Sequence, residues 1–147
     1  MRGLDDFDLI LPKFETDITE DLPFKLSPRR GRFEDVLIYY DNLNTKDIYE
    51  TETYATYCGG NYRLEIIKNH KPNNGAKVLI IKDSFANVVT PFLCLQTSEL
   101  HICDMRGFER MNGQEIDLKQ YINEIKPDYV LVLFGGVSSL ESLSTQN

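Results

Sequence analysis

Three polar residues, Lys82, Asp83 and Ser84, follow directly after the apolar run at residues 78–81, and Ser84 carries a hydroxyl that could do chemistry. The Ser84 hydroxyl is a candidate nucleophile, because ligands and reactive groups collect at the carboxyl ends of the strands in α/β proteins. The same position suits a helix N-cap, because serine is a favoured cap residue and the next apolar residues recur at helical spacing. The spacing alone leaves both interpretations of Ser84 open.

A glycine-rich turn upstream is the first candidate for assisting Ser84. Gly59, Gly60 and Asn61 could offer backbone and amide donors to an oxyanion. The alternative is a tight turn in which glycine is needed for positive φ. Both interpretations remain open.

Three further residues are candidates around the same position. Asp83 could orient the loop, although capping the helix is the simpler role. Asn87 falls one helical turn after Ser84 and could hydrogen-bond the loop. Arg106 could hold a carboxylate or phosphate at the same edge of the sheet, although a surface salt bridge is the simpler role for it.

Alternating strands and helices must position these residues. The apolar patterns predict strands at 77–81, 100–103 and 129–134, a helix after Ser84 and a second helix over 114–125. Pro91 should kink the first helix or end its first part. Strand–helix alternation implies parallel strands joined by right-handed crossovers, so we expect a three-layer α/β/α fold with a parallel, flavodoxin-like sheet.

The organisation along the chain changes near residue 75. Residues 1–75 mix short β-prone runs, such as 36–40, with polar segments, which predicts an irregular β-rich portion. A dense turn signal at 69–75 separates it from the α/β portion at 76–137, which we expect to belong to the same domain. The Ser-rich residues 138–147 should form a flexible tail.

The composition excludes several classes of protein. A chain of 147 residues with 41% hydrophobic residues can bury one core, and a net charge of −7 argues against a nucleic-acid partner. No apolar run reaches the roughly 20 residues of a membrane span. Cys58, Cys94 and Cys103 are far apart and only two histidines are present, so we expect no metal site. We expect no cofactor either, and the turn after residue 81 lacks the glycines of a dinucleotide site.

Several blocks in a consistent order resemble the C-terminal half of the DHHW family, a group of bacterial proteins related to the SGNH-hydrolase-like domains of alginate O-acetylation proteins. The resemblance extends from about Asp8 to Phe134. The blocks are Tyr57-Cys58-Gly59-Gly60-Asn61-Tyr62-Arg63-Leu64 with Ile67-Lys68-Asn69, Lys77 to Asn87 with Pro91-Phe92-Leu93, Asp104-Met105-Arg106, and Asp128-Tyr129-Val130-Leu131.

This resemblance implies a Ser-His-Asp esterase or O-acetyltransferase that acts on a cell-surface glycan, with Ser84 as the nucleophile. The serine needs an imidazole to take its proton, and the imidazole needs a carboxylate to hold its tautomer. The family supplies both from an Asp-His-His-Trp motif upstream of the matched region, and this chain has no such motif. His70 and His101 belong to no family signature, and we expect them to be exposed or half-buried.

We therefore expect the chain to be the C-terminal part of a longer protein and a poor catalyst alone. The resemblance implies a glycan or an acylated small molecule as substrate, an extracytoplasmic location, and membrane attachment only through an N-terminal anchor outside this chain. A homodimer through the face left uncovered is a further expectation. The alternative is a non-catalytic carbohydrate-binding or scaffold domain, in which Ser84 only caps its helix through the amide of Ala86 or Asn87.

Overall fold

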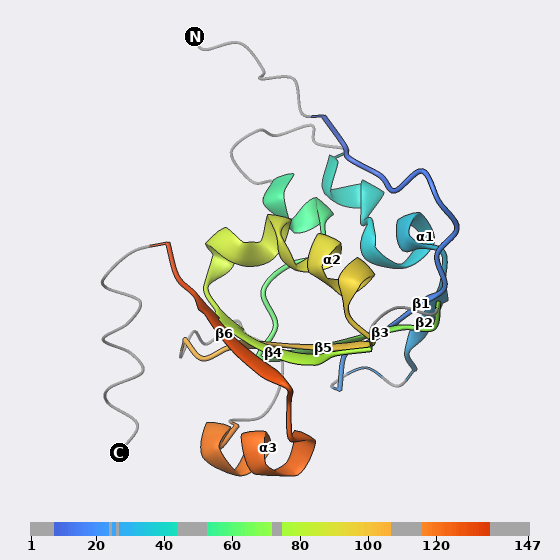
Figure 1. The fold of residues 1–147 in the computed structure, drawn as a ribbon. Coiled ribbons are helices and arrows are strands. Elements are labelled where there is room, and N and C mark those ends of the chain that lie inside the picture. The colour runs from blue at the N-terminus through green and yellow to red at the C-terminus, as the bar shows by residue number, and fades with distance from the viewer. Residues whose placement is uncertain are drawn as a thin grey trace, which may run out of the picture.

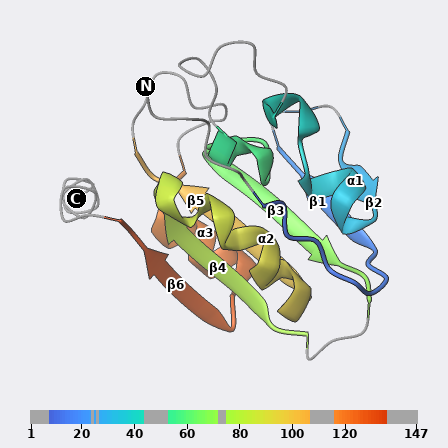
Figure 2. The same ribbon diagram turned by 90° about the horizontal axis from the view of Figure 1, so that it is seen from above.

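One six-stranded sheet organises the chain. The computed structural model describes residues 8–23, 25, 27–43, 53–71, 75–106 and 116–135, and the predicted tail at 138–147 lies outside them. The strand order is β2-β1-β3-β5-β4-β6 (Figures 1 and 2). The strands are β1 (Ile18–Asp21), β2 (Arg29–Gly31), β3 (Leu64–Asn69), β4 (Lys77–Lys82), β5 (Glu99–Asp104) and β6 (Tyr129–Leu133).

The three strands predicted from apolar runs are confirmed as β4, β5 and β6. Strand β4 lies between β5 and β6 and is parallel to both. Its residues from Val78 to Lys82 are all buried, which is typical of a parallel strand covered on both faces. Because β5 and β6 lie on opposite sides of β4, the strand order reverses at β4, and its carboxyl end is a topological switch point.

The expectation of a wholly parallel sheet is wrong, because the sheet is mixed. Strand β3 pairs with β5 in antiparallel orientation, and β1 pairs with both β3 and β2 in the same way. In β1 and β3 buried residues alternate with less buried ones over Ile18–Asp21 and Leu64–Ile67, as in antiparallel strands with one well-covered face. The strand–helix alternation on which the prediction rested is confined to the second half of the chain.

Helical segments cover both faces of the sheet (Figure 1). Helix α3 (Leu118–Ile125) lies on one face, over Leu79, Ile81 and Cys103. It begins later than the predicted residue 114; Gln114 lies outside the described residues, and Asp117 caps the helix by accepting from the Gln120 amide at 2.9 Å. The opposite face carries α1 (Phe33–Leu37), η1 (Tyr40–Leu43), η2 (Thr53–Thr56), η3 (Ser84–Val88), α2 (Thr90–Leu93) and η4 (Cys94–Gln96).

The β-prone run at 36–40 mostly does not form a strand. Val36 and Leu37 end the short helix α1, and only Ile38 makes an isolated bridge with Tyr57. Phe33, Val36 and Leu37 are spaced so that one side of this turn is buried in the core. The Phe33 amide donates to the Thr16 hydroxyl at 2.7 Å, which supplies the cap that the sequence signal did not suggest.

The helix predicted after Ser84 is divided into η3, α2 and η4. Pro91 lies in the first turn of α2, where a missing amide hydrogen costs nothing. Within η3, Ala86 and Asn87 are buried, while Phe85 is 75% exposed.

Strand β6 is at the edge of the sheet and leaves apolar side chains uncovered. Its first four residues, Tyr129 to Val132, are between 37% and 63% exposed. Their register against Val78–Ile81 of β4 places them alternately on the two faces of the sheet. The strand is therefore incompletely covered on both faces.

Candidate active site

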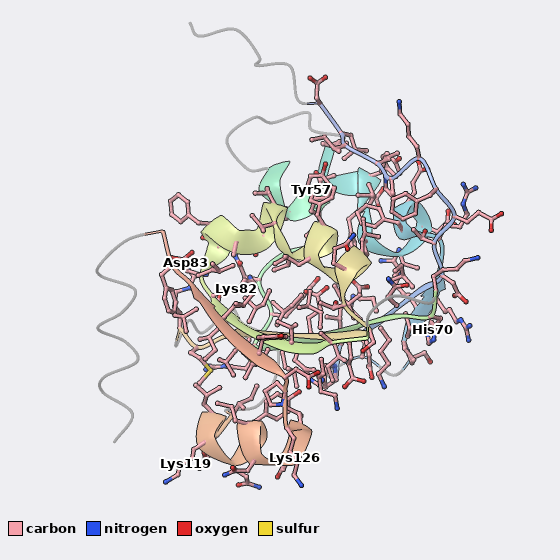
Figure 3. The ribbon with its side chains drawn as sticks, viewed as in Figure 1. Tyr57, His70, Lys82, Asp83, Lys119 and Lys126 are labelled. Carbon is pink, nitrogen blue, oxygen red and sulfur yellow. The ribbon has the colours of Figure 1, made fainter. Side chains whose placement is uncertain are left out.

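Ser84 lies where the topology predicts a ligand site. It is the first residue of η3, one residue after Asp83 and two after the end of β4. The preceding Asp83 is almost fully buried, and its Oδ1 accepts from the Phe85 amide at 3.0 Å. Its Oδ2 accepts from the Gly135 amide at 2.8 Å, just after β6. Asp83, which is labelled in Figure 3, therefore joins the segment after β4 to the segment after β6.

The structure gives the capping role to Asp83, so the interpretation of Ser84 as the cap is wrong. Ser84 is half-buried, and its hydroxyl makes no hydrogen bond with any residue in the described part of the chain. The amides of Phe85 and Ala86 are already used by Asp83, through its carboxylate and its carbonyl oxygen at 3.2 Å. These two amides are therefore not free to donate to an oxyanion at Ser84.

A buried lysine and two asparagines form a hydrogen-bonded group beneath this turn. Lys82 is 2% exposed, and its Nζ donates to Oδ1 of Asn87 and, at 3.4 Å, to Oδ1 of Asn61. Asn87 Nδ2 also donates to Asn61 Oδ1 at 3.0 Å. Asn87 follows Ser84 by one 3₁₀ turn and lies on its side of η3, so the group adjoins the serine.

The glycines before Asn61 shape the turn that brings it there. Cys58, Gly59 and Gly60 have φ values of 57°, 72° and 140°. A Cβ at Gly59 would also lie 2.7 Å from the Tyr39 ring and 2.8 Å from the Tyr62 hydroxyl oxygen, whereas Gly60 faces open space. The turn is thus present at both glycines, and the donor interpretation of their amides stays a prediction, while Asn61 supplies the side chain that bonds to Lys82 and Asn87.

Four buried charged residues form a staggered row across four strands, on the face of the sheet that carries α2. Lys82 is paired in register with Asp104 on β5, Glu65 on β3 lies opposite Ile102, and Glu20 on β1 lies opposite Ile67. Burial raises the pKa of Glu65 well above its ordinary value, and the charge of Glu20 raises it further. Sequence reasoning did not find this row, because one inward-facing glutamate in a short strand carries no recognisable signal.

The two glutamates are arranged to hold a proton together. Burial raises the pKa of Glu20, while the Tyr39 hydroxyl, which donates to its Oε2 at 2.6 Å, opposes the shift. One carboxyl oxygen of each, Oε1, is buried and has no hydrogen-bond partner among the described residues. Two facing carboxyl groups in a low-dielectric site cannot both be ionised cheaply, so the pair favours sharing one proton.

Arg106 is committed to a neighbour. Its guanidinium makes two hydrogen bonds to the fully buried Asp104 carboxylate, at 2.9 and 2.5 Å, and its backbone amide makes a third at 3.1 Å. The salt bridge favoured by the sequence is therefore present, but it is largely buried instead of lying on the surface.

Neither histidine lies near Ser84. His70 follows β3 and is exposed, with Nε2 and the Thr19 hydroxyl oxygen 2.8 Å apart, at the opposite end of the sheet from Lys82 and Asp83 (Figure 3). His101 lies on the face covered by α3, in register with Leu79, about 10 Å along the strands from the end of β4. It is buried, contrary to expectation, between Glu99 and Tyr121, each at 2.6 Å.

Metal and membrane features are absent from the described part of the chain. No cluster of three or more potential ligands of the His, Cys, Asp and Glu types occurs there. Cys58, Cys94 and Cys103 are free and buried, as predicted for Cys94 and Cys103. None of the helices described is long and apolar enough to cross a membrane.

Comparisons with known proteins place the fold. No protein-family model matches the chain, and no curated protein matches it either. Among solved structures, a DHHW family protein from Eubacterium siraeum DSM 15702 is similar, with 21% identity and a TM-score of 0.59 over 88% of this chain and 40% of that one. Bacillus cereus PatB1 is similar with 26% identity and a TM-score of 0.57 over 82% of this chain and 35% of that one.

A second structure of PatB1, which carries a sulfonyl adduct, matches with 26% identity and a TM-score of 0.56, over 82% of this chain and 37% of that one. The chain thus has a DHHW-like fold and spans two fifths or less of the length of these neighbours.

Proposed function

We propose that Ser84 is the acylated residue of a serine esterase or O-acetyltransferase that acts on a cell-surface glycan. The observation that carries this proposal is the half-buried Ser84 hydroxyl at the switch point, which no hydrogen bond to the described residues holds. The likeness to PatB1 supports it, because that protein has been seen with a sulfonyl adduct and sulfonyl electrophiles react with activated nucleophiles.

The proposed reaction has two steps. Ser84 Oγ attacks the carbonyl carbon of an acyl donor, its proton passes to a base, and the donor's leaving group departs to give an acyl ester on Ser84. A sugar hydroxyl, or water in an esterase, then attacks the ester carbonyl and regenerates Ser84. The Nδ2 group of Asn61, which makes no hydrogen bond within the described residues, is the donor we assign to the developing oxyanion.

The base of this reaction is expected outside these 147 residues. The sequence contains two histidines, and both lie far from Ser84. We therefore propose that the histidine and its carboxylate belong to an upstream segment of a longer protein, as the family resemblance implies. Removal of triad members leaves only a small part of the rate, so this chain alone should be a poor catalyst.

The remaining functional assignments follow from the same resemblance. We propose a glycan or an acylated small molecule as substrate, an extracytoplasmic cell-surface location, and membrane attachment only through an upstream anchor. We also propose that two copies can associate through the uncovered strand β6. We also propose that the reaction needs no cofactor.

A second candidate function is a non-catalytic carbohydrate-binding or scaffold domain. The distance of both histidines from Ser84 favours it, as does the exposed ring of Phe85 beside the serine, which could stack on a sugar. In this alternative Asp83 caps η3, and Ser84 would lie in the binding surface without reacting.

Hydrolysis of p-nitrophenyl acetate tests the two functions. The proteins compared are this chain, the chain extended upstream in its gene through any Asp-His-His-Trp segment, and the extended Ser84→Ala variant. Ser98→Ala is a matched control, because Ser98 lies just before β5 at the opposite end of the sheet. Activity that requires the extension and Ser84 but not Ser98 is expected. Activity indifferent to Ser84, or none in any form, would favour the binding domain.

A further inference from the structure

Lys82 is a buried ammonium group without a direct salt bridge. Its Nζ lies within hydrogen-bonding distance of two neutral amide oxygens, on Asn87 and Asn61, and no carboxylate of the described residues forms an ion pair with it. Burial lowers the pKa of Lys82, and the charges of Asp104 and Glu65 oppose that shift from a greater distance. Burying a charge in this way costs free energy that an apolar side chain would not, so stability does not explain the lysine.

The chemistry of the ammonium group determines how both amides are oriented. An ammonium can only donate, so each asparagine must turn its oxygen, and not its nitrogen, toward Nζ. Asn87 then has Nδ2 left to donate, and it donates to Asn61 Oδ1 at 3.0 Å. The oxygen of Asn61 therefore faces two donors, and its Nδ2 must turn away from the buried group.

Asn61 is the most solvent-exposed member of this group. It is half-buried, while Lys82 and Asn87 are buried. Its partner Asn87 lies one 3₁₀ turn from Ser84 on the same side of η3. The amides directly after Ser84 are occupied by Asp83.

We propose that Lys82 is a positioning residue: its ammonium group fixes the amides of Asn87 and Asn61, so that Asn61 presents Nδ2 as a donor to the acyl carbonyl oxygen at Ser84. This inference rests on the proposed acyl transfer and adds to it a buried cation that does not touch the substrate. Without the cation either amide could rotate by half a turn, and Asn61 could present an oxygen, which would repel the oxyanion.

Hydrogen exchange of the side-chain amides tests the geometry without any reaction. In the ¹⁵N-labelled chain, the Lys82 ammonium protons should exchange more slowly than those of Lys119, which is exposed on α3. Lys82→Met should speed exchange of the Asn87 amide protons by at least about tenfold, since a hydrogen bond to a charged group is lost. Lys77→Met, at the other end of β4, should not.

Two results would overturn the positioning role. The first is that the Lys82 ammonium protons of the unaltered chain exchange as fast as those of Lys119. This measurement does not depend on whether the variants fold. The second is that the Asn87 amide protons exchange at an unchanged rate in a folded Lys82→Met variant. Lys82→Arg, which keeps a donor-only cation, should preserve part of the protection.

Kinetics of the extended protein separate this inference from the proposed function. Lys82→Met should lower kcat for p-nitrophenyl acetate by about tenfold to a hundredfold with little change in KM, because the donor acts in the transition state. Lys82→Arg should recover part of the loss. A Ser84-dependent reaction that is indifferent to Lys82→Met would refute the positioning role alone, whereas the absence of any Ser84-dependent reaction would refute the proposed function.

Discussion

Replacing Asp83 should reveal how much the switch point depends on one carboxylate. Asp83 is nearly fully buried and accepts from two amides of different segments, Phe85 in η3 and Gly135 after β6. Asp83→Ala removes both acceptors at once. It therefore loses a helix cap and also the bridge that joins η3 to the end of the edge strand.

The expected cost is the sum of two ordinary effects. Loss of an N-cap costs about 1 kcal/mol. Loss of a hydrogen bond from a partly buried amide to an ionised carboxylate costs about 1.5 to 2 kcal/mol. For a chain of this length, a total near 3 kcal/mol corresponds to a fall in Tm of about 6 to 12 °C.

Urea and thermal unfolding followed by circular dichroism would measure this cost. Asp117→Ala is the matched control, because Asp117 caps α3 through one exposed hydrogen bond and should cost only about 1 kcal/mol. Asp83→Asn keeps one acceptor oxygen and should fall between the two. If Asp83→Ala destabilises no more than Asp117→Ala, the bridge to Gly135 contributes nothing and the reasoning is refuted.

Three more predictions concern the core, the turn and the edge strand. Because burial raises the pKa of Glu65 in the folded state, its contribution to stability is lost as pH rises above 4.5, and Glu65→Gln should remove that part of the fall in urea titrations; equal slopes would contradict it. Gly59→Ala should lower the free energy of unfolding by about 2 to 4 kcal/mol, because of the positive φ and contact with the Tyr39 ring. Gly60→Ala should lower it less, because the new methyl group meets open space. Equal losses would show that backbone strain is the only cause. Val132→Lys on the exposed β6 should abolish self-association in sedimentation velocity, and a chain that is monomeric at all concentrations would refute the proposed dimer.

The second half of the fold was predictable because its signals are local. Residues 78–81 of β4 are all apolar, and so are residues 129–133 of β6. Parallel pairing around β4 followed from the helix that separates each strand from the next. The first half gave weaker signals, and the run at 36–40 was predicted as β-prone although Val36 and Leu37 end helix α1.

The site was only partly predictable, for a related reason. The sequence placed Ser84 and Asp83 at the end of a strand, since strand ends can be found from hydrophobicity. It could not show which of the two caps η3, because that depends on where the Gly135 amide lies after β6. The burial of Glu20, Glu65 and Lys82 was not predicted, because it results from pairing between strands far apart in the chain.

The sequence by itself determined the class of fold around β4, the place of Ser84 at a strand end, and the shortage of histidines. These follow from the periodicity of apolar residues and from composition, which need no knowledge of contacts. Only the tertiary structure decided the mixed direction of the sheet, the orientation of Asn61 by Lys82, and the distance of His70 and His101 from Ser84. Each of these depends on which strands become neighbours, and strand pairing brings together residues whose separation along the chain carries no local signal.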